Sequence, residues 1–178
     1  MDDIVRQAIA KWPNVPNCYG WLGLDARGNW WLRDAAAQAR GAFASGVPGA
    51  RGSRLEHEGL IAFIGRNYEA DADGQWYFQN GPQRVYVELE VAPWVWRLHE
   101  DGRIVSHTGR PAQARSLWLD DAGRVYVLTE LGPGLVHSQD VALVAQAIEQ
   151  GRWTLQPIDA AAVPVRFGFV PSPQQRGA

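Results

Sequence analysis

The stretch Asp71–His99 constrains the fold of this chain more than any other part, and it reads DADGQWYFQNGPQRVYVELEVAPWVWRLH. At its centre, Asn80-Gly81 is a strong hairpin signal, because both residue types tolerate the positive φ angles of a two-residue hairpin turn. The strand that follows alternates, with Val85, Val87, Leu89 and Val91 on one face and Arg84, Tyr86, Glu88 and Glu90 on the other. We therefore expect an antiparallel sheet with one buried face and one face in solvent.

The turn that opens this stretch recurs along the chain. Its pattern is Asp-x-x-Gly-x followed by two bulky residues, the second always aromatic; copies begin at Asp25, Asp71 and Asp120, and a weaker one begins at His99. Turn chemistry alone can produce this pattern, because aspartate bonds to its own turn backbone and glycine adopts a positive φ. The alternative is a structural duplication of helix-plus-hairpin units, since the copies are too few and too unevenly spaced for a propeller or a solenoid.

Apolar residues at helical spacing predict amphipathic helices over 2–12, 54–66 and 139–150. The second of these helices follows Ser53-Arg54-Leu55-Glu56, which has the pattern of a capping box. The segment Gly41–Gly52 has no periodicity and many glycines, which predicts a flexible loop.

Further hairpins are expected over 18–33 and 116–129, and Gly132-Pro133-Gly134 is expected to end the second one. Val163–Phe169 alternates as a last strand, where Pro164 indicates a position at the sheet edge.

Together these elements predict an α+β fold, an antiparallel sheet built from repeated hairpins with about three amphipathic helices packed on it. A chain of 178 residues suits one domain, which we place at residues 1–170. Two similar subdomains, over about 1–98 and 99–170, are the alternative. The polar tail, residues 171–178, is expected to be disordered.

Composition excludes several classes of protein. The formal net charge of -2 argues against a nucleic-acid-binding protein, whose affinity comes from a basic surface. No run of about 18 apolar residues occurs, so no membrane-spanning helix is expected. Cys18 is the only cysteine, which excludes an intrachain disulfide and fits the cytoplasm. The opening MDDIVRQAIAKW lacks the apolar core of a signal peptide.

The chain carries no recognised catalytic, phosphate-binding or dinucleotide-binding motif. Its four histidines show no metal-ligand spacing. Glu69–Gly74 imitates the start of a calcium loop, but the twelfth position is Asn80, which cannot supply the bidentate carboxylate. We therefore predict no catalytic residue, no metal site and no cofactor.

Nine tryptophans are many for a chain of this length, and exposed aromatic clusters mark contact surfaces. Neighbouring residues of a strand face opposite sides, so one member of each bulky pair lies off the core. A guanidinium in a Gly-Arg-Pro loop could also clamp an anion. The candidate binding residues are Trp31, Tyr77, Trp94, Trp96, Arg110 and Trp118.

The opening MDDIVRQAIAKWPNVPNCYGWLGLDARGNW and the block GQWYFQNGPQRVYVELEVAPWVW resemble a family of uncharacterised proteobacterial proteins of unknown function. This resemblance covers most of the chain and implies no activity. The Asp-x-x-Gly-x-Trp-Tyr turn, the GPQR block and the Ala92-Pro93-Trp94 bend resemble a second uncharacterised bacterial family. That resemblance implies repeated α+β motifs and a role in signalling.

No residue pattern identifies a reaction or a ligand. The sequence favours a non-enzymatic cytoplasmic binding or regulatory protein, acting through a protein interface or a small-ligand contact. Its partner would be an unknown protein or a second copy in a homodimer. The alternative is an enzyme or a small-molecule carrier with a cleft near the loop 41–52. A cleft with converging polar groups of shifted pKa would favour that alternative.

Overall fold

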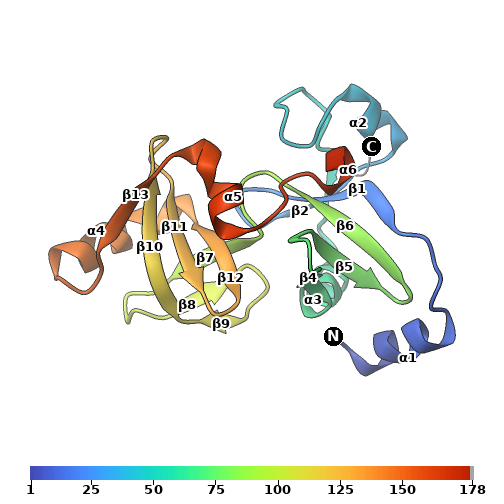
Figure 1. Ribbon diagram of the computed structural model, residues 1–178, viewed down its shortest axis with the longest axis horizontal. Helices are drawn as coiled ribbons and strands as arrows, with labels where there is room; N and C mark the ends of the chain where they lie inside the picture. Colours follow the sequence, from blue (N-terminus) through green and yellow to red (C-terminus); the bar gives the residue numbers. More distant parts are fainter. Residues whose placement is uncertain (177–178) are drawn as a thin grey trace. The chain divides into compact units, whose positions relative to one another are not determined.

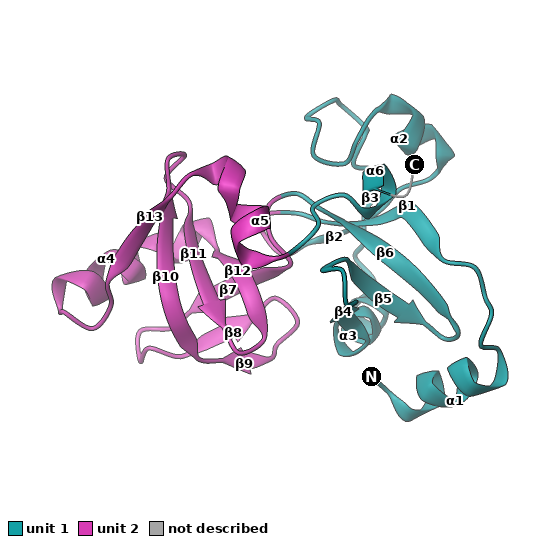
Figure 2. Ribbon diagram, in the orientation of Figure 1, with its two compact units in different colours: residues 1–25, 29–90, 169–178 teal, residues 26–28, 91–168 magenta. Residues whose placement is uncertain are grey.

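The structure is a computed structural model that describes residues 1–176. Two compact units divide the chain, and Figure 2 colours them separately. Unit 1 comprises residues 1–25, 29–90 and the C-terminal segment from Phe169, and unit 2 comprises residues 26–28 and 91–168. Each unit contains one mixed sheet, six-stranded in unit 1 and seven-stranded in unit 2, so the fold is α+β.

The sheet of unit 1 has the strand order β3-β2-β1-β6-β5-β4. The strands are β1 (Cys18–Leu24), β2 (Trp30–Leu32), β3 (Ser53–Arg54), β4 (Tyr68–Ala70), β5 (Trp76–Asn80) and β6 (Gln83–Leu89). The predicted β5–β6 hairpin is confirmed, but its turn residues are Gly81 and Pro82 instead of Asn80 and Gly81, because Asn80 pairs with Gln83. The prediction of an antiparallel sheet is wrong at the centre, where β1 and β6 run parallel. Local alternation could not reveal this pairing, because it joins segments that are far apart in sequence, such as Leu22 and Val87.

Four helices belong to unit 1, namely α1 (Asp3–Lys11), α2 (Ala35–Arg40), α3 (Glu58–Arg66) and α6 (Pro173–Arg176). The predicted capping box does not form. Ser53 pairs with Leu32 instead, and the backbone N–H of Leu55 donates to the carbonyl of Trp30 at 2.8 Å. The helix therefore starts later, where Nδ1 of His57 accepts from the backbone N–H of Leu60 at 3.0 Å.

Both faces of this sheet are covered. On one face, the aromatic rings of Trp30 and Tyr68 meet edge to face at 5.2 Å, and Phe78 packs against Phe63 of α3 at 5.5 Å. On the other face, which the alternation assigns to solvent, Glu88 is only 2% exposed. The prediction of one wet face is therefore wrong at this position.

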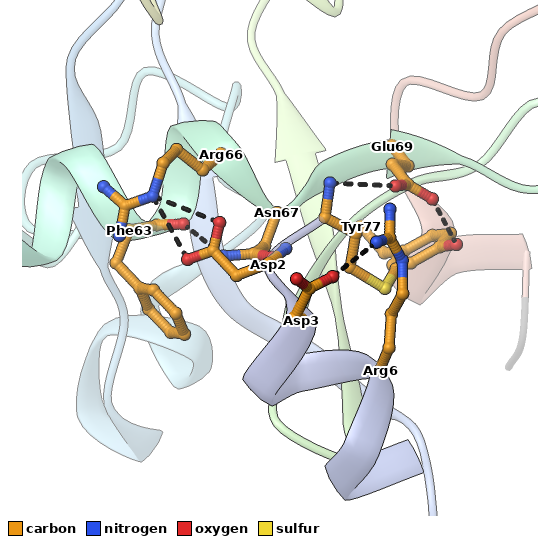
Figure 3. Close-up of polar contacts among 9 residues, drawn as sticks. Asp2, Asp3, Arg6, Phe63, Arg66, Asn67, Glu69 and Tyr77 are labelled. Carbon is orange, nitrogen blue, oxygen red and sulfur yellow. Dashed lines mark hydrogen bonds and ion pairs between the residues drawn. The ribbon is translucent and has the colours of Figure 1, made fainter. Parts of the chain in front are cut away.

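The helix α1 is fastened to the corner between α3 and β4, as Figure 3 shows. The backbone N–H of Asp2 donates to Oδ1 of the buried Asn67 at 2.8 Å. The carboxylate of Asp2 also pairs with Nε of Arg66 at 3.1 Å. The amino group of Met1 lies 3.9 Å from the carboxylate of Glu69. The predicted first helix is thus confirmed and held by polar contacts.

The sheet of unit 2 has the strand order β13-β10-β11-β12-β7-β8-β9. The strands are β7 (Trp94–Leu98), β8 (Ile104–Ser106), β9 (Pro111–Ala112), β10 (Ala114–Asp120), β11 (Val125–Thr129), β12 (Gly132–Val136) and β13 (Leu155–Ile158). β7 runs parallel to β12, and β10 runs parallel to β13. Only Gln113 separates β9 from β10, although they stand far apart in the strand order. The sheet therefore curls into a half-barrel (Figure 1).

Two predicted elements of unit 2 are wrong. Gly132-Pro133-Gly134 does not end the hairpin but begins β12, because Thr129 pairs with Gly132 and continues the meander. Val163–Phe167 forms the helix α5 and no strand. Pro164 fits the first turn of this helix, which needs no N–H there, and Gly168 ends it with a φ of 70°.

The helix α4 (Val141–Glu149) confirms the third predicted helix. Residues 1–176 contain six α-helices, more than the expected three or so. The tail predicted to be disordered is ordered as far as the structure describes it, because residues 173–176 form α6. The last two residues of that tail lie outside the described residues.

The three predicted turns have one geometry. The backbone N–H of the aspartate donates to the carbonyl four residues on, at 3.0, 2.9 and 3.0 Å for Asp25, Asp71 and Asp120. The N–H of that fourth residue donates back to the carboxylate at 2.9, 2.9 and 2.7 Å. Ser106 makes the same turn with a hydroxyl, which accepts the N–H of Arg110 at 3.1 Å. The sequence pattern did not identify this copy.

The aromatic position of the pattern has a physical reason in two copies. The indole N–H of Trp31 donates to Asp25 at 2.9 Å, and the hydroxyl of Tyr126 donates to Asp120 at 2.9 Å. At Asp71, the donor is Tyr86 from the neighbouring strand, at 3.0 Å. In all three turns, the aspartate carboxylate thus accepts a hydrogen bond from an aromatic side chain. The strand after the turn supplies this donor in two of them.

Candidate functional site

Three of the candidate binding residues lie in the cores of the two units. Trp94 and Trp96 of unit 2 are 1% and 0% exposed, and their indole N–H groups donate to the carbonyls of Leu131 and Val127 at 2.8 and 3.0 Å. Tyr77 of unit 1 is also buried, and its hydroxyl lies 3.4 Å from the carboxylate of Glu69 (Figure 3). These three side chains offer no aromatic surface to a partner.

The other three candidates reach the surface, one of them in unit 1 and two in unit 2. Trp31 of unit 1 is half-buried, with the guanidinium of Arg51 above its ring at 5.9 Å. Trp118 of unit 2 is half-buried, with the guanidinium of Arg166 at 5.3 Å from its ring. Arg110 is exposed, and its guanidinium lies 5.6 Å from the ring of Trp94.

The glycine-rich loop after α2 is anchored by one buried arginine. Arg33 is 1% exposed and follows β2. Its guanidinium donates to the carbonyls of Ala50 at 2.8 Å, Gly20 at 3.1 Å and Gly41 at 2.6 Å. Two of these acceptors stand near the two ends of the loop 41–52. The interpretation of that segment as a flexible loop thus missed a specific anchor.

Phe43 packs the loop onto the sheet. Its ring lies 6.0 Å from the guanidinium of Arg33 and 5.6 Å from that of Arg51. It also rests on Gly23 of β1, where an added Cβ would lie 2.5 Å from the ring. Arg51 in turn pairs with Glu90, at the end of β6. The guanidinium groups of Arg33 and Arg51 and the space above Gly23 therefore hold Phe43, and with it this side of the loop.

The C-terminal segment covers the same face of the sheet. The backbone N–H of Leu89 donates to the carbonyl of Pro171 at 2.8 Å, and the N–H of Val170 donates to the carbonyl of Gly74 at 2.9 Å. The side-chain amide of Gln174 donates to Gln38 of α2 at 3.1 Å. Figure 1 shows α6 beside β1 and α2. The segment 169–176 is therefore docked on the sheet of unit 1, and we call it the strap.

Glu88 lies under this strap. Its Oε1 accepts the backbone N–H of Gln174 at 3.0 Å. Burial raises the pKa of its carboxyl group, while hydrogen bonds from Ser172 and Gln174 and the positive charge of Arg33 act in the opposite direction. Burial also lowers the pKa of Arg33, against the effect of Glu88. Arg33 and Glu88 thus both lie in a part of the sheet face that is largely shielded from solvent.

A cleft of about 240 Å³ opens beside Glu88. Its lining consists of Ala42, Phe43, Ala44, Ser45, Glu88, Leu89, Pro171, Ser172 and Gln175. Glu88 is the one ionisable side chain in this lining. The cleft can therefore accept a hydrogen-bond donor at its carboxyl group and apolar atoms along its walls. It is the candidate functional site of unit 1.

Sequence reasoning placed a cleft near the loop 41–52 but missed Glu88. The alternation of β6 assigned that side chain to the solvent face. The useful signal was the excess of polar residues on that face, because such a face must meet solvent, a partner or a covering segment. The covering residues, 41–45 and 171–175, are distant in sequence and could not be identified from it.

The structure offers neither a metal centre nor a membrane span over residues 1–176. No three side chains of His, Cys, Asp or Glu among them gather as ligands of a metal ion would. None of the described helices is long and apolar enough to cross a bilayer.

Comparison with solved structures finds similarity to two DUF1285 family proteins. The protein from Silicibacter pomeroyi DSS-3 is 13% identical, with a TM-score of 0.50 over 82% of this chain and 84% of that chain. The protein from Shewanella baltica OS155 is 14% identical, with a TM-score of 0.48 over 71% of this chain and 91% of that chain. At 13% identity, the likeness to the Silicibacter pomeroyi protein concerns the fold alone.

No curated protein matches the sequence. The model of the family DUF2944, which is described as "Protein of unknown function (DUF2946)", matches residues 1–174. The match spans nearly the whole chain and both units, in agreement with the resemblance of the opening segment and the β5–β6 block. The chain belongs to this bacterial family of unknown function.

Proposed function

We propose that this protein is a non-enzymatic binding or regulatory protein that takes a small ligand in the cleft beside Glu88. The observation that carries the proposal is a carboxyl group, 2% exposed and of raised pKa, on the wall of a mostly apolar cleft. Proteins rarely bury a carboxyl group without a strong reason, and perturbed groups concentrate at functional sites. The single cysteine, Cys18, supports a cytoplasmic protein.

The lining indicates the class of ligand. Small-molecule sites usually span about 300–1,000 Å³, so a cleft of about 240 Å³ suits a small molecule. The carboxyl group of Glu88 accepts hydrogen bonds when ionised, and Phe43, Leu89 and Pro171 supply apolar contact. A short aliphatic amine fits best, because its ammonium group would donate charge-assisted hydrogen bonds to this carboxylate.

Binding is a better interpretation than catalysis. General acid–base chemistry on a substrate commonly uses a second titratable group or a nucleophile beside the first. The lining supplies only Glu88 as an ionisable group, together with the hydroxyl groups of Ser45 and Ser172. An enzyme or a carrier using the same cleft remains the alternative proposal, and turnover of the bound amine would favour the enzyme.

The experiment is a thermal-shift screen of short aliphatic amines, with the matching alcohols and carboxylates, followed by calorimetry on the compounds that stabilise the protein. We expect amines to raise the melting temperature of the wild-type protein and to have no effect on Glu88→Gln. Glu56→Gln is the matched control, because it makes the same change at an exposed residue of unit 1 outside the cleft. Equal binding to wild type and Glu88→Gln, or no stabilising amine, would contradict the proposal.

A second candidate function is binding of a protein, including a second copy of this chain. The observation in its favour is an open hollow in unit 1 that contains two exposed apolar side chains, Trp21 at 48% and Leu32 at 45%. It lies beside Ser53 of the short edge strand β3. Sedimentation velocity over a concentration series tests self-association. We expect Trp21→Ser to weaken it and Trp12→Ser, which removes an equally exposed tryptophan just after α1, to leave it unchanged.

We also propose that the repeated turns reflect internal repetition of a hairpin, and that the protein acts in signalling. Shared turn geometry at Asp25, Asp71 and Asp120 supports the first idea. Turn chemistry acting independently at each site is the alternative explanation. A release or uptake of the cleft ligand that changes binding of a protein partner would support the second idea.

A further inference from the structure

Unit 2 contains a hollow of about 430 Å³ where β10 and β13 begin. These strands pair in parallel from Leu117 and Leu155 onward, so the residues before them are free of that pairing. β13 is also an edge of the sheet, which leaves the hollow open on one side. The lining consists of Ala114, Arg115, Ser116, Leu117, Arg152, Trp153, Thr154 and Gln156.

A β-bulge places one arginine of this hollow. Ala114 pairs with Thr129 and Ser116 pairs with Leu128, so Arg115 is the extra residue of β10. A bulge leaves its extra residue out of the ladder and re-aims a side chain, and bulges are frequent next to functional sites. The irregularity therefore falls at the residue that carries the charge.

The end of α4 places the second arginine. Gly151 has a φ of 69°, and the backbone N–H groups of Arg152 and Trp153 both donate to the carbonyl of Ala147, at 2.9 and 3.3 Å. This closed turn reverses the chain toward β13. It brings Arg152 and the half-buried ring of Trp153 to the lining of the hollow.

The hollow carries a positive charge that no carboxylate of the lining offsets. Among the six ion pairs of the described residues, none involves Arg115 or Arg152. Nε of Arg152 donates to the side-chain oxygen of Gln150 at 2.9 Å, which fixes the guanidinium without neutralising it.

An adjoining hollow of unit 2 shares Ala114 and Trp153 with this one, and the two acids in its lining already have partners. Asp101 pairs with Arg103 at 2.6 Å, and Glu130 accepts the backbone N–H of Gln113 at 2.8 Å. Both carboxylates therefore compete weakly for the two arginines.

We propose that this hollow binds the phosphate group of a small aromatic phosphate monoester. Arg115 and Arg152 would bind the phosphate oxygens, since a guanidinium presents paired donors that match this geometry. The hydroxyl groups of Ser116 and Thr154 would add donors. The aromatic part would lie against the indole of Trp153, which offers a flat apolar surface. The site lies in unit 2 and is independent of the cleft beside Glu88.

Calorimetry at low ionic strength tests the proposal, because exposed charges are screened by salt. The probes are phenyl phosphate, inorganic phosphate and phenol, added to the full chain. We expect phenyl phosphate to bind more tightly than inorganic phosphate, and phenol not to bind. Arg115→Gln and Arg152→Gln should each weaken phenyl phosphate binding roughly tenfold or more, the scale of one charge-assisted hydrogen bond.

Two controls separate this site from general charge attraction. Arg166→Gln removes an exposed arginine of the same unit outside the hollow, and it should leave the affinity unchanged. Trp153→Ala should remove the preference for phenyl phosphate and retain the affinity for inorganic phosphate. Circular dichroism spectra matching wild type would show that the variants are folded. The proposal is overturned if wild type binds no phenyl phosphate, or if Arg166→Gln weakens binding as much as Arg115→Gln does.

Discussion

Replacing Arg33 by methionine should detach the loop 41–52 from the sheet of unit 1. Methionine keeps an unbranched apolar side chain of similar reach but removes all five N–H donors. The carbonyls of Gly20, Gly41 and Ala50 then lose their donor. The positive charge that offsets the buried Glu88 is lost in the same step.

The magnitude follows from the contacts. A hydrogen bond to a charged group contributes about 1.5–3 kcal/mol, so three of them give a gross loss of roughly 4.5–9 kcal/mol. Removing the guanidinium also removes its desolvation cost, which is several kcal/mol for a buried ion. The net loss for breaking such a buried charged group is about 3–5 kcal/mol. That is a large part of the roughly 5–15 kcal/mol that stabilises a typical protein.

Urea unfolding followed by circular dichroism measures the loss, and amide hydrogen exchange locates it. The turn amides of Ser45, Ala50 and Gly52, which donate within the loop, should exchange faster in Arg33→Met. The β11 amides of unit 2 are the internal control and should keep their protection. Arg33→Lys retains the charge without the planar fork, and it should lose about half as much stability.

The reasoning would be refuted by a stability loss below about 1 kcal/mol together with unchanged exchange of the loop amides, since one net hydrogen bond is of that size. Such a result would mean that the packing of Phe43 on Gly23 holds the loop without Arg33.

Three further predictions concern single contacts. Burial raises the folded-state pKa of Glu88 above its ordinary value, so the stability it contributes is fully present below about pH 4.5 and is lost as pH rises through the folded-state pKa. The wild type should therefore lose stability relative to Glu88→Gln as pH rises above 4.5 in paired urea titrations, and a constant difference would contradict the shift. Asp120→Ala removes the acceptor of two turn N–H groups and of the Tyr126 hydroxyl, and should cost about 2–3 kcal/mol in the same assay; a loss equal to that of Tyr126→Phe would show that the turn bonds contribute nothing. Gly23→Ala places a Cβ against the ring of Phe43 and should cost about 1–3 kcal/mol, and Phe43→Leu should recover part of that loss if the clash is the cause.

Much of the local structure could be predicted from the sequence, because its causes are local. Helical spacing predicted α1 and α4, and the dipeptide Asn80-Gly81 predicted the β5–β6 hairpin. The repeated aspartate turns could be predicted for the same reason, since Asp120 accepts hydrogen bonds from Arg124 and Tyr126, which follow it closely in the chain.

The errors arose where distant segments decide the outcome. Ser53 has the pattern of a capping residue, but pairing with β2 makes it a strand residue. Val163–Phe167 alternates like a strand, yet it is a short helix that ends at Gly168. The parallel pairing of β1 with β6 was hidden because alternation specifies the faces of a strand and not its neighbour.

The candidate site shows the same limit in its strongest form. The alternation of β6 correctly separates Val87 from Glu88, but it cannot distinguish solvent from a second covering layer. That layer is built from the loop 41–52 and the strap that starts at Phe169. Arg33 donates hydrogen bonds to the loop, and Glu88 accepts one from the strap. An apolar residue would fill a buried position at lower desolvation cost, and well-packed apolar replacements of buried charges are often neutral or stabilising. Stability alone therefore does not account for a carboxyl group at this place, and this supports our proposal that the cleft binds a ligand.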